Sequence, residues 1–128
     1  FAEWRLRKHG LDTIPIYELD QDANWFPSIP PQQVVTCFDV LEHLEPDVQK
    51  RLLTWMGEIG SLVFTNFIID DIHPGIHLPI DVDDLVAHVQ KKWQAELSDY
   101  YPDADGKPRQ HLLIYGEGVS YPDATPTK

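Results

Sequence analysis

Residues 35–46 read VTCFDVLEHLEP, an apolar strand pattern that runs directly into a polar segment. The run from residue 33 to residue 38 is short and largely apolar, which is typical of a strand covered on both faces of a sheet. Asp39, Glu42 and His43 follow it without a linker. Because ligands of open α/β sheets bind at the carboxyl ends of the strands, this order indicates one wall of a ligand crevice.

The residues after this stretch predict a helix and then a second strand. Pro46 begins the helix, and an acid in its first turn suits the positive end of the helix dipole. Gly57 and Gly60 are expected to end it. The apolar positions recur at helical spacing, at Val48, Leu52, Leu53, Met56 and Ile59. Residues 61–69 form the second apolar run, which we expect to be the parallel neighbour of residues 33–38.

The second half of the chain predicts one more helix and an antiparallel strand pair. The acidic stretch at residues 81–84 is expected to cap a helix whose apolar stripe comprises Leu85, Val86, Val89 and Trp93. Residues 94–100 and 111–115 predict two strands. The turn-rich segment between them is too short for a helical crossover, so they should form a hairpin. The fold class is therefore α/β, with parallel strands and helices followed by an antiparallel pair.

The length predicts one domain, because 128 residues can bury a core but are too few for two domains. We expect a single α/β domain over residues 1–118 and a flexible tail over residues 119–128. Residues 1–9 have the pattern of an amphipathic helix, and residues 13–19 that of an edge strand that contains a proline. The sequence begins inside the helix pattern without an initiator Met, which predicts a fragment or a processed product.

Composition and charge exclude several classes of protein. A net charge of −11 opposes a nucleic-acid partner, since binding phosphates needs a basic face. No apolar run is long enough to span a membrane, and no signal segment opens the chain, so no membrane partner is expected. The single cysteine, Cys37, excludes an internal disulfide and fits a reducing cytoplasm. Its place in the strand pattern favours an inert buried thiol over a nucleophile.

Three segments, in this order, resemble the S-adenosylmethionine-dependent methyltransferases with a Rossmann-like fold. They are QQVVTCFDVLEHLEP at 32–46, GEIGSLVFTNF at 57–67 and PGIHLPID at 74–81. FAEWRLRKHG at 1–10 also resembles the family helix between the second and third strands. The likeness covers about residues 1–95. It implies the carboxyl-terminal part of a methyltransferase domain that transfers a methyl group from S-adenosylmethionine to an acceptor, which we expect to be a small molecule.

The resemblance also implies which parts of the family pattern have no counterpart in this chain. In the family, the first strand ends in a glycine-rich turn beside the methionine part of the cofactor. The second strand ends in an acid that holds the ribose hydroxyls, and neither feature occurs here. Gly116-Glu-Gly118 is followed by no helix pattern, so we interpret it as a turn. We therefore expect weak or absent binding of S-adenosylmethionine by this chain alone, and no activity of the isolated chain.

The resemblance implies five residues in contact with the cofactor. Phe38, Asp39 and Val40 lie where the family's fourth strand meets the cofactor pocket. Asp20 and Asp22 follow the expected edge strand, where the family often has a carboxylate near the adenine amino group. Asp39 also fits a helix cap or a solvated loop acid, and Asp20 and Asp22 also fit ordinary loop acids.

His43 is the catalytic candidate. Beside Glu42, its imidazole fits either a general base toward an acceptor hydroxyl or amine, or a structural contact that holds the loop. Glu42 and His77 are expected to bind the substrate. His73 and His77 together suggest a metal, but the proline and glycine between them disfavour a helical ligand pair. We therefore expect no metal site.

A second hypothesis is a non-catalytic assembly or binding module that has kept the α/β frame without the cofactor site. In the family sheet, two strands lie between the third and the fourth. Without them, the strand at residues 34–38 would expose an apolar edge. We expect this edge either to pair with a second copy, giving a homo-oligomer, or to pair with residues 13–19.

Overall fold

The computed structural model describes residues 2–11, 13–17, 26–69, 77–102, 106 and 108–119. Its elements are α1 (Ala2–Lys8), β1 (Gln32–Cys37), the 3-10 helix η1 (Leu41–His43), α2 (Pro46–Ile59), β2 (Gly60–Ile68), α3 (Val82–Gln90), β3 (Gln94–Pro102) and β4 (Pro108–Gly116). No described helix is both long and apolar enough to cross a membrane. Apart from residue 119, the expected tail at 119–128 lies outside the described residues.

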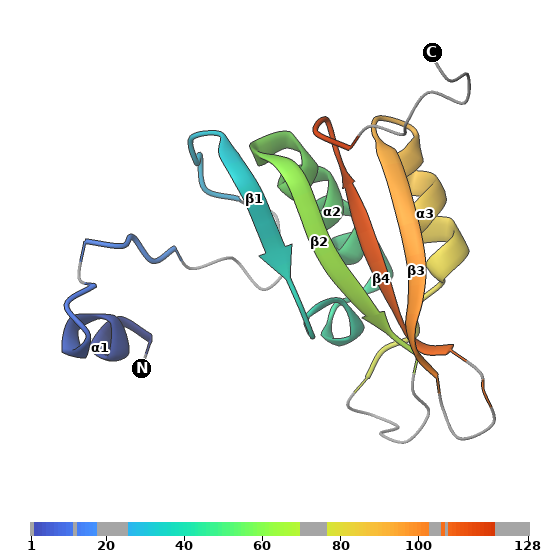
Figure 1. Cartoon of the computed structure of the whole chain (residues 1–128), viewed down its shortest axis with the longest axis horizontal. Coiled ribbons are helices and arrows are strands. Elements are labelled where there is room, and N and C mark those ends of the chain that lie inside the picture. Colours follow the sequence, from blue (N-terminus) through green and yellow to red (C-terminus); the bar gives the residue numbers. More distant parts are fainter. Residues whose placement is uncertain are drawn as a thin grey trace, which may run out of the picture.

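One four-stranded sheet in the order β1-β2-β4-β3 organises the molecule (Figure 1). β1 and β2 are parallel, with a register that runs from Gln32 opposite Gly60 to Cys37 opposite Thr65. β4 is antiparallel to both β2 and β3. The parallel pair and the carboxyl-terminal hairpin confirm the α/β class that the sequence predicts.

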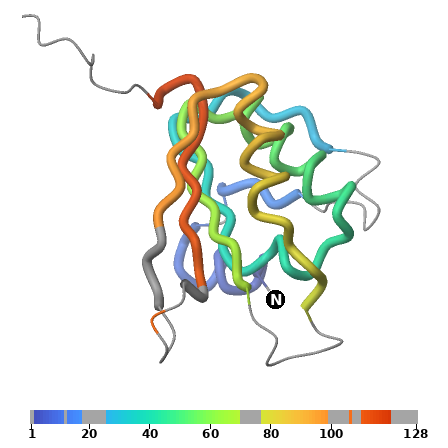
Figure 2. Tube along the Cα trace, turned by 90° about the vertical axis from the view of Figure 1, so that its right-hand side faces the viewer, coloured from blue at the N-terminus to red at the C-terminus, as the bar shows by residue number. Residues whose placement is uncertain are grey.

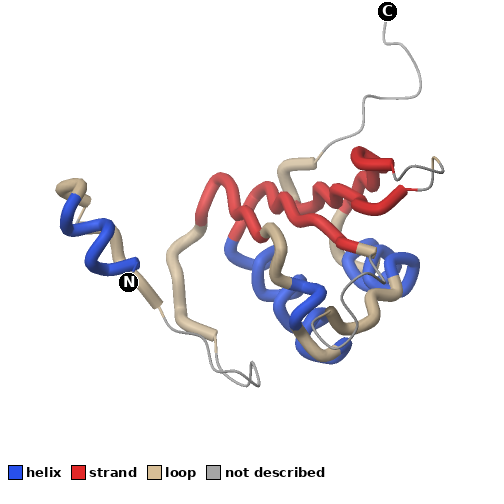
Figure 3. The backbone as a smooth tube through the Cα atoms, turned by 90° about the horizontal axis from the view of Figure 1, so that it is seen from below, coloured by secondary structure: helices blue, strands red, loops and turns tan. Residues whose placement is uncertain are grey.

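Helices α2 and α3 lie against one face of the sheet (Figures 2 and 3). The core between these layers contains Leu41, Leu52, Leu53, Met56, Val63, Phe67, Leu85, Val89, Ala95, Leu113 and Tyr115. The hydroxyl of Tyr115 on β4 donates a hydrogen bond of 2.6 Å to the carbonyl oxygen of Leu53 on α2. Burial raises the pKa of Tyr115, so the hydroxyl stays protonated and joins the sheet to the helix layer.

Gly57 has a different role from the helix stop that the sequence predicts. α2 continues through it to Ile59, and Gly60 is already the first residue of β2. A Cβ atom on Gly57 would lie 2.5 Å from the indole ring of Trp93, which follows α3. Glycine is therefore required at this position because the Trp93 ring packs directly on the backbone of α2.

β1 is not covered on both faces, contrary to the prediction. Only Val35 and Cys37 are half-buried, and the other residues of the strand are exposed, with 51% of Val34 accessible. Among the described residues, β1 pairs with β2 alone, and the described helices of the core cover a single face of the sheet. Residues 13–17 form no strand, and residues 18–19 of the expected edge strand lie outside the described part.

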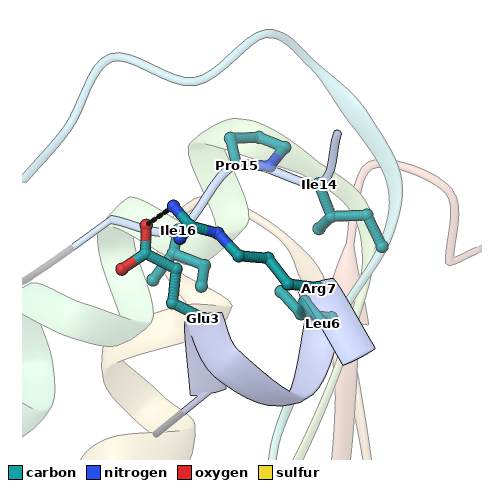
Figure 4. Close-up of a pocket in the computed structure, with 6 residues that line it drawn as sticks. All are labelled: Glu3, Leu6, Arg7, Ile14, Pro15 and Ile16. Carbon is teal, nitrogen blue, oxygen red and sulfur yellow. Dashed lines mark hydrogen bonds and ion pairs between the residues drawn. The ribbon is translucent and has the colours of Figure 1, made fainter. Parts of the chain in front are cut away.

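α1 lies apart from the sheet (Figure 1), and none of its residues is buried. It shares with residues 14–16 a hollow of about 230 Å³ (Figure 4). Within this hollow, Arg7 donates a hydrogen bond of 3.3 Å to Glu3 on the same helix. Both side chains are exposed, so this ion pair contributes little to stability and resembles an ordinary helix-surface pair.

Candidate active site and metal centre

The carboxyl ends of the parallel strands β1 and β2 meet at one edge of the sheet, called the rim here (Figure 1). After β1, the chain turns at Asp39, whose φ of 59° is left-handed. The backbone N–H of Asp39 donates to Oδ1 of Asn66 at 2.8 Å, and Nδ2 of Asn66 donates to Oδ1 of Asp39 at 2.9 Å. This pair of hydrogen bonds fixes the start of the turn to β2.

The 3-10 helix η1 places Glu42 and His43 at the rim. Glu42 is 1% exposed, whereas the His43 side chain is 46% exposed. The backbone N–H of Leu78 donates to the carbonyl oxygen of Glu42, which ties the segment that precedes α3 to η1. His77 consequently lies against His43, with ring centroids 5.1 Å apart and the rings edge-to-face.

Glu42, His43 and His77 form a cluster that can hold a metal ion. One potential ligand atom from each residue lies within 4.8 Å of the other two. Ligand atoms at about 2.1 Å from one ion stand at most about 4.2 Å apart, so a small side-chain movement would complete the site. Two imidazole nitrogens and a carboxylate oxygen suit a divalent ion such as Zn²⁺ or Mn²⁺.

The Glu42 carboxylate has surroundings that would suit a cation ligand. Its Oε1 lies 3.7 Å from Nε2 of His43, which is too long for a hydrogen bond. Its Oε2 is buried and has no hydrogen-bond partner among the described residues. A buried carboxylate is costly unless it is paired or coordinates a metal, so the cluster fits a metal ion on electrostatic as well as geometric grounds.

The structure brings together only part of the set of site residues predicted from the sequence. Glu42, His43 and His77 meet at the rim. Three of the predicted cofactor contacts directly precede η1 in the chain and have exposed side chains, namely Phe38, Asp39 and Val40. Asp20 and Asp22 lie outside the described residues, as does His73.

The sequence suggests a metal for His77 only together with His73, which lies outside the described residues. The structure brings His77 to Glu42 and His43 on η1, a distant segment of the chain. The sequence analysis assigned no role to Asn66, which is 2% exposed. The available signal for Asn66 was an amide inside the otherwise apolar run at residues 61–69, since a buried amide needs hydrogen-bond partners.

Cys37 lies near this site and fits the inert thiol that the sequence favoured. Burial raises the pKa of the Cys37 thiol. The nearby hydroxyl of Thr65 acts in the opposite direction, and the charge of Glu42 again raises the pKa of the thiol. The protonated thiol is a poor nucleophile, so Cys37 belongs to the packing of β1 on β2.

No protein-family model matches the sequence, and no curated protein matches it. Solved structures match the fold. The methyltransferase domain of bacterial CtHen1-CN aligns over 90% of this chain and 70% of that chain, with a TM-score of 0.63 and 12% identity. The small RNA methyltransferase HEN1 aligns over 73% of this chain and 15% of that chain, with a TM-score of 0.50 and 14% identity. At these identities the likeness shows the fold, which is a partial methyltransferase fold.

Proposed function

We propose that this chain forms the carboxyl-terminal part of an S-adenosylmethionine-dependent methyltransferase domain and that its rim cluster binds a divalent metal ion. The observation that carries the proposal is the buried Glu42 carboxylate beside His43 and His77, at the carboxyl ends of parallel strands. The fold likeness to two methyltransferases supports methyl transfer over other metal-dependent chemistry. Because one fold can serve many functions, the proposal depends mainly on the residues of the rim cluster.

The proposed ligands are one carboxylate oxygen of Glu42 and one ring nitrogen each of His43 and His77. A bound divalent ion would orient an acceptor hydroxyl and lower its pKa. As a ligand, His43 would not be the free general base that the sequence analysis predicts. Without an ion, it remains the candidate base, because it is the exposed imidazole of the cluster.

Methyl transfer asks little more of the protein than alignment. The acceptor oxygen forms a bond to the methyl carbon while the carbon–sulfur bond of the sulfonium breaks, and the acceptor hydroxyl loses its proton to a base. Positioning and exclusion of water supply most of the acceleration for such a step. We propose Phe38, Asp39 and Val40 for contact with the cofactor, since they stand exposed at the carboxyl end of β1. On the basis of the sequence resemblance, we also propose that Asp20 and Asp22 contact the cofactor.

We propose a small-molecule acceptor that carries a hydroxyl group. The net charge of −11 opposes binding of a polyanion and supports this choice. The second structural neighbour is described as a small RNA methyltransferase, so RNA is the acceptor that an experiment must separate from a small molecule. The thiol form of Cys37 suits a reducing compartment, and we propose a cytoplasmic location.

Calorimetric titration with Zn²⁺ and Mn²⁺ tests the metal site. We expect saturable binding of one ion per chain. Glu42→Gln and His77→Ala should each weaken it by at least about tenfold, since each removes a ligand. His9→Ala, which removes an exposed histidine beside α1, is the matched control and should leave the affinity unchanged. Absence of saturable binding by the unmodified chain would contradict the metal site.

Amide NMR spectra with millimolar S-adenosylmethionine test the cofactor proposal. We expect shifts at residues 38–40, with ATP as an adenine-containing control that produces none there. Micromolar affinity would contradict the expected weak binding, and absence of any shift would favour the assembly-module hypothesis.

Transfer of labelled methyl groups to small hydroxyl compounds rather than to short RNA would support the proposed small-molecule acceptor. Transfer to RNA would show that the acceptor is RNA instead.

A further inference from the structure

We infer that Asn66 is a positioning residue of the rim cluster and acts through Asp39. This inference rests on the proposed metal site for its functional meaning. Its geometric basis is independent of any ion, because it consists of hydrogen bonds between the turn after β1 and the neighbouring strand β2.

The Asn66 side chain continues the hydrogen bonding of the sheet beyond the last backbone pair. The parallel register of β1 and β2 ends where Cys37 lies opposite Thr65. Asn66 is the next residue of β2, and its amide oxygen accepts from the backbone N–H of Asp39. Its amide nitrogen donates to the Asp39 carboxylate, so both ends of the buried amide are used by one residue.

Asp39 has a backbone conformation that needs such support. It is the one non-glycine residue with positive φ in the described part of the chain. L-residues other than glycine rarely adopt this region, although aspartate and asparagine tolerate it better than most. The two hydrogen bonds between Asn66 and Asp39 therefore stabilise this left-handed conformation at the start of the turn.

The position of Asp39 decides where η1 begins. Val40 follows it and precedes the first residue of η1, and Glu42 and His43 complete η1. The other end of this turn is held separately, because Nε2 of Gln49 donates to the carbonyl oxygens of Leu41 and Leu44 at 2.8 and 2.9 Å. Asn66 is thus the anchor at the entrance of the turn, and its loss should loosen the cluster while Gln49 keeps the exit in place.

A purely structural role for Asn66 makes a different prediction from a positioning role. A buried amide that only satisfies local hydrogen bonds would lower the free energy of unfolding when removed, without changing the relation between His43 and His77. A core truncation remote from the rim provides the matched case. Val89→Ala on α3 removes buried methyl groups at a fully buried position and should destabilise the fold without moving the rim.

The first measurement uses the metal-free chain and reads the cross-relaxation between the ring protons of His43 and His77. We expect a clear signal in the unmodified chain and in Val89→Ala, and its loss in Asn66→Ala. Asp39→Asn keeps a side-chain oxygen acceptor and tolerates the left-handed region, so it should retain the signal. A signal that persists in Asn66→Ala, or that is lost equally in Val89→Ala, would overturn the inference.

The second measurement is the affinity for Zn²⁺ in a double-mutant cycle with Asp39→Gly. Loss of a residue that hydrogen-bonds a metal ligand directly typically weakens binding by about 10- to 100-fold. Asn66 reaches the ligands only through Asp39, so we expect Asn66→Ala to weaken binding by at most about tenfold. In the Asp39→Gly background the same change should add little, because the partner through which Asn66 acts is gone. Equal weakening in both backgrounds would show that Asn66 does not act through Asp39. If the unmodified chain binds no ion, the proposed function fails, and the ring-proton measurement alone decides the positioning role.

Discussion

His88 couples the stability of the helix layer to pH. Its Nε2 lies 2.8 Å from the hydroxyl oxygen of Thr54 and 3.1 Å from the carbonyl oxygen of Lys50, both on α2. Desolvation lowers the pKa of His88, and the charges of Lys50 and Lys91 lower it further. The hydrogen bond with the Lys50 carbonyl and the charge of Asp84 act in the opposite direction, but the net shift is downward.

The lowered pKa of His88 predicts a loss of stability in mild acid. The unfolded chain binds a proton on this imidazole near pH 6.5, whereas the folded chain does so only at lower pH. The free energy of unfolding should therefore fall as pH drops from about 6.5 toward the folded pKa. Urea denaturation of the unmodified chain and of His88→Gln at pH 7.5 and pH 5.5 measures this, and the variant should show the smaller decrease.

The exposed His9 provides the control for this prediction, because His9→Gln should leave the pH dependence unchanged. An equal decrease in the unmodified chain and in His88→Gln would contradict the assignment. At the residue scale, the sequence analysis assigned no role to His88. Its environment depends on α2, which contacts it from a distant part of the chain.

At the scale of elements, the amino terminus of α3 shows how a local signal sets a boundary. The sequence predicts a cap within the acidic stretch 81–84, and the structure identifies the capping residue as Asp81, whose side chain accepts a hydrogen bond of 3.0 Å from the backbone N–H of Asp84. Lys50 on α2 also lies 2.7 Å from the Asp84 carboxylate. Both side chains of this ion pair are open to solvent, which screens the attraction, so the pair should contribute little to stability.

Removal of the cap should shift stability by a measurable amount. Asp81→Ala leaves an N–H of the first turn without its acceptor and is expected to lower the free energy of unfolding by about 1 kcal/mol. Asp81→Asn retains the side-chain oxygen and should lie within about 0.5 kcal/mol of the unmodified chain. Chemical denaturation measures both, and equal losses in the two variants would show that charge rather than capping dominates.

The elements differ in how well the sequence predicts them. α2 and β2 follow from their apolar patterns, because both bury the expected side chains against the core. β1 has an equally apolar pattern, yet most of it is exposed. An apolar sequence pattern shows only that the side chains are suited to burial. Whether they are buried depends on neighbouring segments, and the described residues include none that covers the second face of β1.

At the scale of the whole molecule, the outer edge of β1 is the surface suited to assembly. Its sequence QQVVTC contains no charge and no proline, the usual features that protect an edge strand from pairing. Residues 13–17 do not form a strand beside it, so the pairing within one chain that the sequence analysis considered is not observed there. We propose that a second copy pairs with this edge around a twofold axis, since an uncharged strand can pair with itself without like-charge repulsion.

Sedimentation velocity over a range of protein concentrations tests this assembly. The unmodified chain should show a concentration-dependent dimer. Val34→Lys, which adds a charge to the exposed edge, should shift the population toward monomer. Gln90→Lys makes the same change of charge at an exposed position of α3 and should leave the dimer intact. A strictly monomeric unmodified chain would rule out the proposed dimer.

The sequence by itself determined the features that arise from nearby residues: the helix and strand periodicities, the acidic cap at residues 81–84 and the order that makes β1 and β2 parallel neighbours. Tertiary structure alone decided the features that arise between distant segments. These include the contact of His77 with His43, the hydrogen bonds between Asn66 and Asp39, and the packing of Trp93 on Gly57. The physical reason is that the periodicity of apolar residues along the chain indicates which face of a helix or strand is buried. It does not indicate which distant segment packs against that face, because this depends on how the whole chain folds.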